Sequence, residues 1–481
     1  MICPSQGDAE VGPWIVVGLG YGDEGKGSVV DWLVRTRGAR LVVRFNGGPK
    51  AAHHVVTPEG RSHCFSQVGA GTFLPGVETL LAAPMVVDPL ALAVEWAVLA
   101  TKLASTGGLG SVASRMILDP ECPVVTPYHA WFNQMLELTR GTEAHGTCGR
   151  GLGEVLADQK TAGAPLLHLK DLANRSRTAA LLGRIRDHRL AQAEALLLAH
   201  PNQVQLKALF EEASTPEVPG FLVDRYQALI RTPGLRLIGA QEYLATVLRE
   251  GVGVVFEGAQ GALLDMDQGF WPHVTPSRTT AENALALLAG LGHPCSPCKI
   301  GVTRAYLTRH GAGPLITEDP ELARALPEPH NQNDGWQGRM RIGWPDALAL
   351  RYGITINQGI DRLFVTCLDR LVGLEDVLLC EGYLPLDSSG DSSGDSSRLP
   401  VQRLTPVAWD KASRQDQTTT LRHCRPHYRR LEGWKRSDAG HLTEPAWSFL
   451  EVLGKRVGQP VDWISIGPTA GDKLSAHERL R

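Results

Sequence analysis

The residues with the clearest potential for chemistry lie in a glycine-rich turn near the N-terminus, Val16-Val-Gly-Leu-Gly-Tyr-Gly-Asp-Glu-Gly-Lys-Gly-Ser28. An apolar run at residues 14–17 predicts a buried strand before the turn, and a helical pattern follows it. A strand, a glycine turn and a helix N-terminus present backbone N–H groups to an anion, which suits a phosphate. From Gly20 the spacing matches the phosphate-loop pattern, except that Gly27 stands where Ser or Thr normally binds magnesium. Asp23 is therefore the candidate metal ligand or base in this turn.

The turn is one of several short blocks whose order and spacing resemble those of the adenylosuccinate synthetase family. The blocks are Gly22-Asp-Glu-Gly-Lys-Gly27, Arg44-Phe-Asn-Gly-Gly48 with His53, Gly146-Thr-Cys-Gly-Arg-Gly151, Phe256-Glu-Gly-Ala-Gln-Gly261, Thr303-Arg-Ala-Tyr306 with Gly311-Ala-Gly-Pro314, and Gly338-Arg-Met-Arg-Ile-Gly-Trp344. The resemblance covers residues 14–475. It implies a GTP-dependent ligase that joins L-aspartate to inosine monophosphate (IMP) in purine nucleotide biosynthesis, with release of GDP and phosphate.

The resemblance also implies a two-step reaction and the residues that catalyse it. A purine carbonyl oxygen is first phosphorylated by GTP, and the amino group of aspartate then displaces the phosphate. Asp23 matches the base that removes the ring N1 proton, and its carboxylate can also hold Mg²⁺. His53 matches the histidine that stabilises charge on the transferred phosphoryl group. Gln260 is the third catalytic match, and the carbonyl of Ala52 is a second metal ligand, although alanine replaces the family's glycine.

By the same resemblance, GTP binds between the N-terminal turn and two blocks far along the chain. Lys26 is the expected phosphate contact, with the backbone N–H groups of 25–28 lining the phosphate. Asp369 can accept hydrogen bonds from guanine N1 and the 2-amino group, and Cys367 stands where the family has a lysine. The predicted GTP-binding residues are Gly22, Glu24, Gly25, Lys26, Gly27, Ser28, Arg341, Asp369, Ser465 and Gly467.

The acceptor side departs from the family pattern. Lys50 replaces an asparagine, Cys148 replaces the second threonine of Gly-Thr-Thr-Gly-Arg, and no arginine stands near Gly163 or Ala164, where a dimer partner normally contributes one. Because an arginine–phosphate pair is a strong contact, we expect Lys50 to supply the missing cation. The residues predicted to bind the acceptor nucleotide are Lys50, Thr147, Cys148, Gln260, Thr275 and Arg339.

The loop for the amino-acid donor is altered as well, since Trp336-Gln-Gly-Arg339 replaces the family's Thr-Thr-Gly-Arg. Arg150, Arg339 and Arg341 are predicted to bind the carboxylates of aspartate. These departures leave two alternatives open: a paralogue that aminates another purine nucleotide or nucleoside-like acceptor, and a catalytically silent nucleotide-binding regulator. The intact Asp23 disfavours the regulator and also the viral relatives that aminate a guanine nucleotide.

Alternating apolar runs and turns predict the elements that position these residues. They indicate an α/β fold with a large, mostly parallel central sheet and a helical insertion at about 165–250. We expect a tail at 1–13, a single domain at 14–475, and a flexible acidic Ser/Gly loop at 387–397. Expected strands are 14–17, 40–45, 80–87, 252–257 and 361–366, and expected helices are 89–104, 191–200 and 240–249.

Composition argues against several other classes of protein. Of 481 residues, 43% are hydrophobic and 21% charged, as in globular proteins, and the net charge of −3 does not favour nucleic acid or anionic membranes. No apolar run approaches the roughly 20 residues of a membrane helix, and the N-terminus has no secretory pattern. Nine cysteines without a framework spacing predict reduced thiols, and the single Cys295-Ser-Pro-Cys298 is not read as a metal or redox site. We therefore expect a cytoplasmic enzyme, and the resemblance adds a homodimer.

Overall fold

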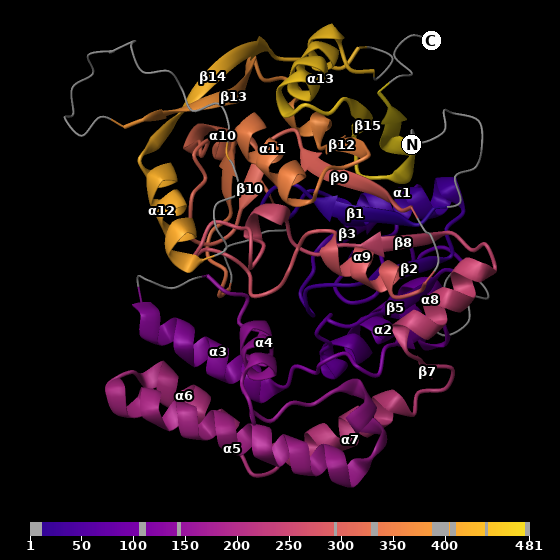
Figure 1. Cartoon of the computed structure of the whole chain (residues 1–481), viewed down its shortest axis with the longest axis vertical. Helices are drawn as coiled ribbons and strands as arrows, with labels where there is room; N and C mark the ends of the chain where they lie inside the picture. The colour runs from indigo at the N-terminus through magenta and orange to yellow at the C-terminus, as the bar shows by residue number, and fades with distance from the viewer. Residues whose placement is uncertain are drawn as a thin grey trace.

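The computed structural model describes residues 12–104, 112–141, 146–292, 296–328, 335–386, 404, 410–437 and 441–476. Its centre is a ten-stranded sheet, with helices on both faces (Figure 1). In spatial order the strands are β16 (Lys473–Ser475), β15 (Val461–Ser465), β12 (Arg362–Thr366), β9 (Cys298–Arg304), β1 (Trp14–Gly18), β8 (Val254–Glu257), β2 (Leu41–Arg44), β5 (Glu78–Leu81), β6 (Met116–Leu118) and β7 (Arg236–Leu237). All neighbouring strands are parallel except β15 and β16. The predicted fold class is confirmed.

The middle of the sheet is buried on both faces, as its continuous apolar strands require. Along β1, Trp14 and Val16 point into a core shared with α1 (Lys26–Arg37). The alternate residues, Ile15 and Val17, point into a second core formed with α8 (Ala240–Arg249) and α9 (Glu282–Ala289). Because side chains alternate along a strand, these two cores fix β1 between helices on both sides.

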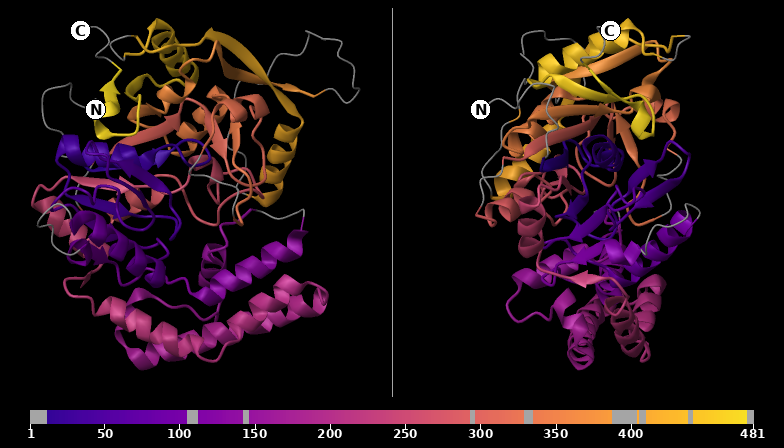
Figure 2. Two further views of the ribbon diagram at one scale, coloured as in Figure 1. Left: turned by 180° about the vertical axis from the view of Figure 1, so that it is seen from behind. Right: turned by 90° about the vertical axis from the view of Figure 1, so that its right-hand side faces the viewer.

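A layer of helices lies beside the sheet, at the bottom of Figure 1 and in both views of Figure 2. It contains α3 (Pro127–Arg140), α4 (Leu152–Lys160), α5 (Arg175–Ala199), α6 (Val204–Ala213) and α7 (Val218–Ile230). The layer begins before residue 165, because α3 packs with α5 and Arg189 on α5 bonds the Glu154 carbonyl and the Asp158 carboxylate on α4. The expected helix 191–200 is the last part of α5, and the expected helix 240–249 matches α8.

One predicted strand is shorter than expected. The apolar run 80–87 forms a strand only as far as Leu81, after which the chain turns and Met85 N–H bonds the carbonyl of Ala82. Pro84 lies in this turn and cannot donate a ladder hydrogen bond, so the strand cannot continue through it. The next element, α2 (Pro89–Ala104), has the predicted bounds. The acidic loop 387–397 lies outside the described residues.

Smaller elements complete the site and its surroundings. They are the strand pairs β3 (His53–Val56) with β4 (Ser62–Phe65), β10 (Leu307–Arg309) with β11 (Arg341–Gly343), and β13 (Asp376–Pro385) with β14 (Cys424–Glu432), and the helices α10 (Pro320–Ala325), α11 (Ala347–Ile356), α12 (Lys411–Arg422) and α13 (Glu444–Val457). Each pair is antiparallel. Among the described helices, none is both long and apolar enough to cross a bilayer.

Candidate active site

The N-terminal turn lies at the carboxyl ends of the central parallel strands, which is the edge where open α/β sheets bind ligands. The turn leaves β1 at Gly18 and enters α1 at Lys26. Leu19 N–H bonds the carbonyl of Val302 on β9 at 2.9 Å. At the end of β12, the hydroxyl of Thr366 donates to the carbonyl of Glu24 at 2.7 Å. Two strands that lie far along the chain, β9 and β12, therefore shape this turn.

Inside the turn, a buried carboxylate binds Lys26, the side chain that the sequence assigned to phosphate. Glu24 is 3% exposed, and its Oε1 accepts from the N–H groups of Gly20 and Gly22 at 3.1 and 2.8 Å. Its Oε2 pairs with Lys26 Nζ at 2.5 Å. Glu24 is thus an internal anion that binds the backbone of the turn and pairs with the lysine inside it. The predicted phosphate role of Lys26 stays a prediction, because this pair would have to loosen.

His53, at the start of β3, lies directly against the beginning of α1. A Cβ atom on Gly27 would sit 2.6 Å from the Cβ of His53, closer than side chains can approach. Gly27 therefore occupies the Ser/Thr position of the phosphate-loop pattern because only glycine lets β3 pack here. This contact places the predicted catalytic histidine at the N-terminus of α1, beside the turn that carries Asp23.

A buried carboxylate orients the His53 ring. Glu257, the last residue of β8, is fully buried, and its Oε1 lies 2.5 Å from His53 Nδ1. Its Oε2 accepts from the N–H of Ala70 at 3.0 Å. Burial lowers the pKa of His53 below its ordinary value, and the opposing charge of Glu257 offsets this only in part. If Nε2 is to donate to a phosphoryl oxygen, the ring must carry both protons, and Glu257 is the counterion for that imidazolium.

Sequence reasoning did not assign Glu257 a role in the site. The available signal was an acidic residue that ends an otherwise apolar buried strand, because such a carboxylate needs a partner. Although burial by itself would raise the pKa of Glu257, the charges of Arg44 and His53 lower it. Glu257 is therefore ionised at neutral pH and holds the histidine in place.

Asp23 stands at the apex of the turn in a left-handed conformation, with φ of 60°. Its carboxylate Oδ2 lies 3.3 Å from His310 Nε2. Its main-chain carbonyl accepts a hydrogen bond from Arg304 Nε. Although burial alone would raise the pKa of Asp23, the His310 hydrogen bond and the charges of Arg304 and Lys26 lower it. Asp23 is therefore a carboxylate at neutral pH, as a base must be.

Two further predicted residues contact each other beside the turn. The amide of Gln260 donates to the hydroxyl of Thr275 at 2.6 Å and accepts from Ser277 at 2.9 Å. Gln260 has φ of 63°, and the following Gly261 touches the turn so closely that an added Cβ would lie 2.2 Å from the Gly20 carbonyl. The block at 256–261 is therefore packed onto the N-terminal turn. Ser277 was not predicted from the sequence.

The predicted guanine contacts come from two strand ends. Asp369 lies on a short helix just after β12, and the Ser465 hydroxyl donates to the Gly467 carbonyl at 2.7 Å. Lys473, on β16, also donates to the Gly467 carbonyl, at 3.1 Å. Burial lowers the pKa of Lys473 to about 8, although its charge interacts with Asp369 and Cys367. The sequence analysis did not assign this lysine, whose ammonium contacts the predicted guanine block at Gly467.

The predicted acceptor loop is attached to the helical layer. The Thr147 hydroxyl donates to Asn133 Oδ1 on α3 at 2.9 Å, and Asn133 Nδ2 donates to Glu154 on α4 at 2.9 Å. Glu137 on α3 accepts from the N–H of Gly146 at 3.0 Å. α3 therefore sets the position of this loop, a role that its sequence did not reveal.

The amino-acid loop lies against the acceptor loop. Lys50 Nζ donates to Gln337 Oε1 at 3.2 Å, and a Cβ on Gly149 would lie 2.5 Å from the Trp336 ring. Three of the positions that depart from the family pattern, Lys50, Trp336 and Gln337, thus meet at the boundary of the two loops. Burial raises the pKa of the neighbouring Cys148 thiol.

The three arginines predicted to bind aspartate lie in different settings. Arg150 and Arg339 are exposed. Arg341, on β11, donates to Glu318 at 2.8 Å and to the Gly313 carbonyl at 2.7 Å. The structure therefore gives Arg341 partners of its own, and its predicted contacts with GTP and aspartate would require it to exchange them.

The described residues contain no group of three or more His, Cys, Asp or Glu side chains that could hold a metal. Mg²⁺ in nucleotide sites is commonly bound through one or two carboxylates, substrate phosphates and water. The ionised Asp23 carboxylate and the exposed Ala52 are compatible with such a site.

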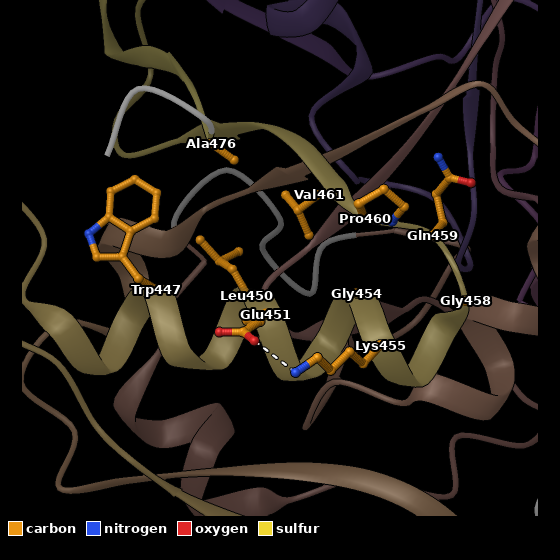
Figure 3. A pocket seen from close by; sticks show the side chains of 10 residues that line it. All are labelled: Trp447, Leu450, Glu451, Gly454, Lys455, Gly458, Gln459, Pro460, Val461 and Ala476. Carbon is orange, nitrogen blue, oxygen red and sulfur yellow. Dashed lines mark hydrogen bonds and ion pairs between the residues drawn. The ribbon is translucent and has the colours of Figure 1, made fainter. Parts of the chain in front are cut away.

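A separate groove lies on the outer surface, away from these residues. Figure 3 shows it between α13 and β15, where Trp447, Leu450 and Val461 line a space of about 460 Å³. Its charged lining groups, Glu451 and Lys455, pair with each other at 2.7 Å. None of the predicted site residues lines this groove.

Comparisons with known proteins agree over nearly the whole chain. The sequence model of the adenylosuccinate synthetase family matches residues 15–473. The adenylosuccinate synthetase of Thioalkalivibrio sulfidiphilus is 35% identical over 461 residues, which are 94% of this chain and 96% of that protein. That of Edwardsiella ictaluri is 32% identical over 462 residues, with the same coverage of 94% and 96%.

Solved structures support the same architecture. Fully ligated adenylosuccinate synthetase from Plasmodium falciparum superposes with a TM-score of 0.76 at 24% identity and covers 96% of this chain and 99% of its own. Cyanophage S-2L succinoaminodeoxyadenylate synthetase, bound to dGMP and dATP, gives a TM-score of 0.54 at 15% identity and covers 97% of this chain and 95% of its own. At these identities the two structures establish the fold.

Proposed function

The chain belongs to the adenylosuccinate synthetase family, and we propose that its site forms adenylosuccinate from IMP and L-aspartate with GTP as phosphoryl donor. It is a ligase that forms a carbon–nitrogen bond in purine nucleotide biosynthesis. One observation supports the residue assignments: Asp23, His53 and Gln260 come from three separate segments of the chain and lie around one turn.

In the first step, Asp23 removes the proton from N1 of IMP, and the resulting O6 oxyanion attacks the γ-phosphorus of GTP. The bond from that phosphorus to the β-phosphate oxygen breaks, so that GDP leaves and 6-phosphoryl-IMP forms. His53 donates from Nε2 to the phosphoryl group as negative charge spreads over its oxygens. Glu257 supports this role because it is the buried counterion at Nδ1.

In the second step, the amino group of aspartate attacks C6 and inorganic phosphate leaves. The carbon–oxygen bond breaks as the carbon–nitrogen bond forms, and the amine loses a proton. Arg339 and Arg150, both exposed, are the candidates to bind the donor's carboxylates. Lys50 is the candidate cation for the acceptor's 5′-phosphate, because it lies at the contact between the acceptor loop and the amino-acid loop.

Mg²⁺ is used by this family generally, and here the Asp23 carboxylate and the Ala52 carbonyl would hold it. When bound, the ion neutralises charge on the GTP phosphates.

We further propose that the chain works as a cytoplasmic homodimer. The segment 161–163, after α4, is exposed and lacks the arginine that a partner normally contributes. A dimer of this chain would therefore complete the acceptor site with a different contact.

A component-omission assay tests this function. The purified chain is incubated with GTP, Mg²⁺, IMP and aspartate, each omitted in turn, while phosphate and adenylosuccinate are measured. We expect one phosphate per adenylosuccinate, and neither product without IMP. Nucleotide binding with no acceptor-dependent phosphate release would instead identify the silent regulator.

Because Lys50, Cys148 and Gln337 depart from the family pattern, the identity of the acceptor nucleotide needs a test of its own. We therefore include GMP, dGMP and inosine as acceptors in the same assay. A higher kcat/KM for IMP than for these three supports IMP as the substrate. A higher value for inosine would show that the acceptor carries no 5′-phosphate, and one for a guanine nucleotide would identify a paralogue.

A further inference from the structure

The side chain of His310 contacts the carboxylate of Asp23, the proposed base. His310 follows β10, and its Nε2 lies 3.3 Å from Asp23 Oδ2. The two side chains are 21% and 24% exposed, so both lie at the border between the protein interior and solvent. An acceptor nucleotide that gives its proton to Asp23 would approach from this solvent-facing side. No role has so far been assigned to His310.

The segment that carries His310 also holds the backbone of the turn. The hydroxyl of Thr308 donates to the carbonyl of Gly22 at 3.4 Å, and Arg304 donates to the carbonyl of Asp23. Arg304 is itself fixed, since its guanidinium bonds Glu328 at 2.6 Å. One side of the turn is therefore attached to the β9–β10 segment through both its main chain and its carboxylate.

Fixing the main chain does not orient the carboxylate, because the terminal torsion of aspartate is broad and two-fold. The left-handed conformation of Asp23 sets where its Cα–Cβ bond points. A donor on Oδ2 then selects one rotation of the carboxylate and leaves Oδ1 for another partner. His310 supplies that donor from Nε2.

We propose that His310 is a positioning residue that orients the Asp23 carboxylate toward the proton it removes from the acceptor. The inference rests on the proposed role of Asp23 as the base. It extends that role by naming the group that holds the base, and it explains why a histidine stands directly before the glycine-rich segment 311–314.

Two substitutions separate hydrogen bonding from simple packing. His310→Leu keeps the approximate size of the side chain and removes the donor, whereas His310→Gln keeps an N–H donor on a side chain of similar reach. We expect His310→Leu to lower kcat about 10- to 100-fold, as for a reacting group displaced by about 1 Å. The KM values for GTP and IMP should stay near those of the unmodified protein. His310→Gln should retain most of the activity.

The opposite patterns overturn the proposal. An unchanged kcat in His310→Leu would show that the contact does not matter for the reaction. Equal losses in both variants would indicate a packing role, and a raised KM with unchanged kcat would make His310 a substrate contact. Circular dichroism and GTP affinity, measured on each variant, identify any variant that fails to fold; in that case His310→Asn replaces it.

A double variant distinguishes failure of this inference from failure of the proposed function. If His310 acts through Asp23, adding His310→Leu to Asp23→Asn should lower the remaining activity no further, because the two residues act as one unit. Additive losses would overturn the inference while leaving Asp23 as the base. Near-normal turnover of Asp23→Asn alone would instead remove the base role, whatever His310 does.

Discussion

The N-terminal turn and the acceptor side of the site are built in different ways. Around the turn, side chains are held at the ends of buried strands, as Glu257 is at the end of β8 and Thr366 at the end of β12. On the acceptor side, Lys50, Gln337 and Arg339 stand on loops, and Lys50 and Arg339 are exposed. The turn keeps the family pattern, whereas the acceptor side has changed at several positions.

The difference follows from what each region touches. A change at the turn disturbs close contacts with neighbouring strands, such as that between Gly27 and His53 on β3, so few residues are tolerated there. A change on an exposed loop alters one contact and leaves the core intact. We therefore expect substitutions at the turn to lower kcat and substitutions on the acceptor side to raise the acceptor KM.

The largest effect should come from Asp23→Asn. Turnover should fall about 10²–10⁴-fold, the usual cost of removing a general base, while GTP binding persists because Glu24 and Lys26 still shape the turn. Steady-state kinetics and direct GTP binding measure the two properties separately. Loss of GTP binding in parallel with turnover would show that Asp23 mainly holds the nucleotide. That result would contradict the expectation that substitutions at the turn act on kcat.

The next largest effect should come from His53→Ala. Removing a donor that stabilises developing charge costs about 10²–10³-fold in kcat. Glu257→Gln should give a smaller loss of the same kind, because Gln can still accept from Nδ1 but no longer balances an imidazolium charge. Both are measured as kcat, with thermal unfolding as the check on folding. A Glu257→Gln variant with full activity would show that the histidine works as a neutral ring.

On the acceptor side, Lys50→Asn restores the family residue and should nevertheless weaken acceptor binding. A charge-assisted contact contributes about 1.5–3 kcal/mol, which corresponds to a rise of about 10- to 100-fold in acceptor KM. The KM for GTP should hardly change. Gln337→Ala is the matched control, since it removes the half-buried partner of Lys50 but keeps the charge, and should change acceptor KM less than about fivefold. An unchanged acceptor KM in Lys50→Asn would contradict the assignment.

A smaller effect is expected for the choice of phosphoryl donor. GTP should be preferred over ATP by about tenfold in kcat/KM, because the Asp369 carboxylate can accept from two donors that adenine lacks. Asp369→Asn should reduce this ratio toward one by lowering kcat/KM for GTP. Equal values for the two nucleotides in the unmodified protein would show that Asp369 does not read the base.

The smallest effect on activity should come from Asp346→Asn, at a helix cap that is none of the predicted site residues. Asp346 caps α11 and accepts from Tyr383 at 2.7 Å, and burial raises its pKa to about 6 from an ordinary value of 3.8. Because the folded protein binds this proton more tightly, the group's stabilisation is complete below about pH 4 and is lost as pH rises through about 6. The loss amounts to about 3 kcal/mol.

Asp346→Asn should remove this dependence, because the amide keeps the cap and does not titrate. Urea unfolding of both proteins from about pH 4 to pH 8 gives the comparison, and the difference between them cancels the groups that they share. We expect the variant to gain stability relative to the unmodified protein as pH rises. A constant difference would show that Asp346 titrates at its ordinary pKa.

Local patterns in the sequence were sufficient to define much of the framework. The glycine turn and its flanking strand, the helix Pro89–Ala104 and the helix Ala240–Arg249 follow from residue types within a few turns of chain. Such patterns report burial and backbone conformation, which depend mainly on neighbours in sequence. The ordered blocks also identified the family, because each block requires specific residue types at fixed spacing.

The tertiary structure decided which distant residues meet. Strand β8 lies between β1 and β2, although it follows them by some 200 residues, and this order places Glu257 under His53. In the same way His310 reaches Asp23, and Lys50 reaches Gln337. No local pattern encodes these contacts, because the order of strands in a sheet depends on how separate segments pack together. The sequence therefore predicted Asp23 and His53 as site residues, and only the folded chain revealed the groups that contact them.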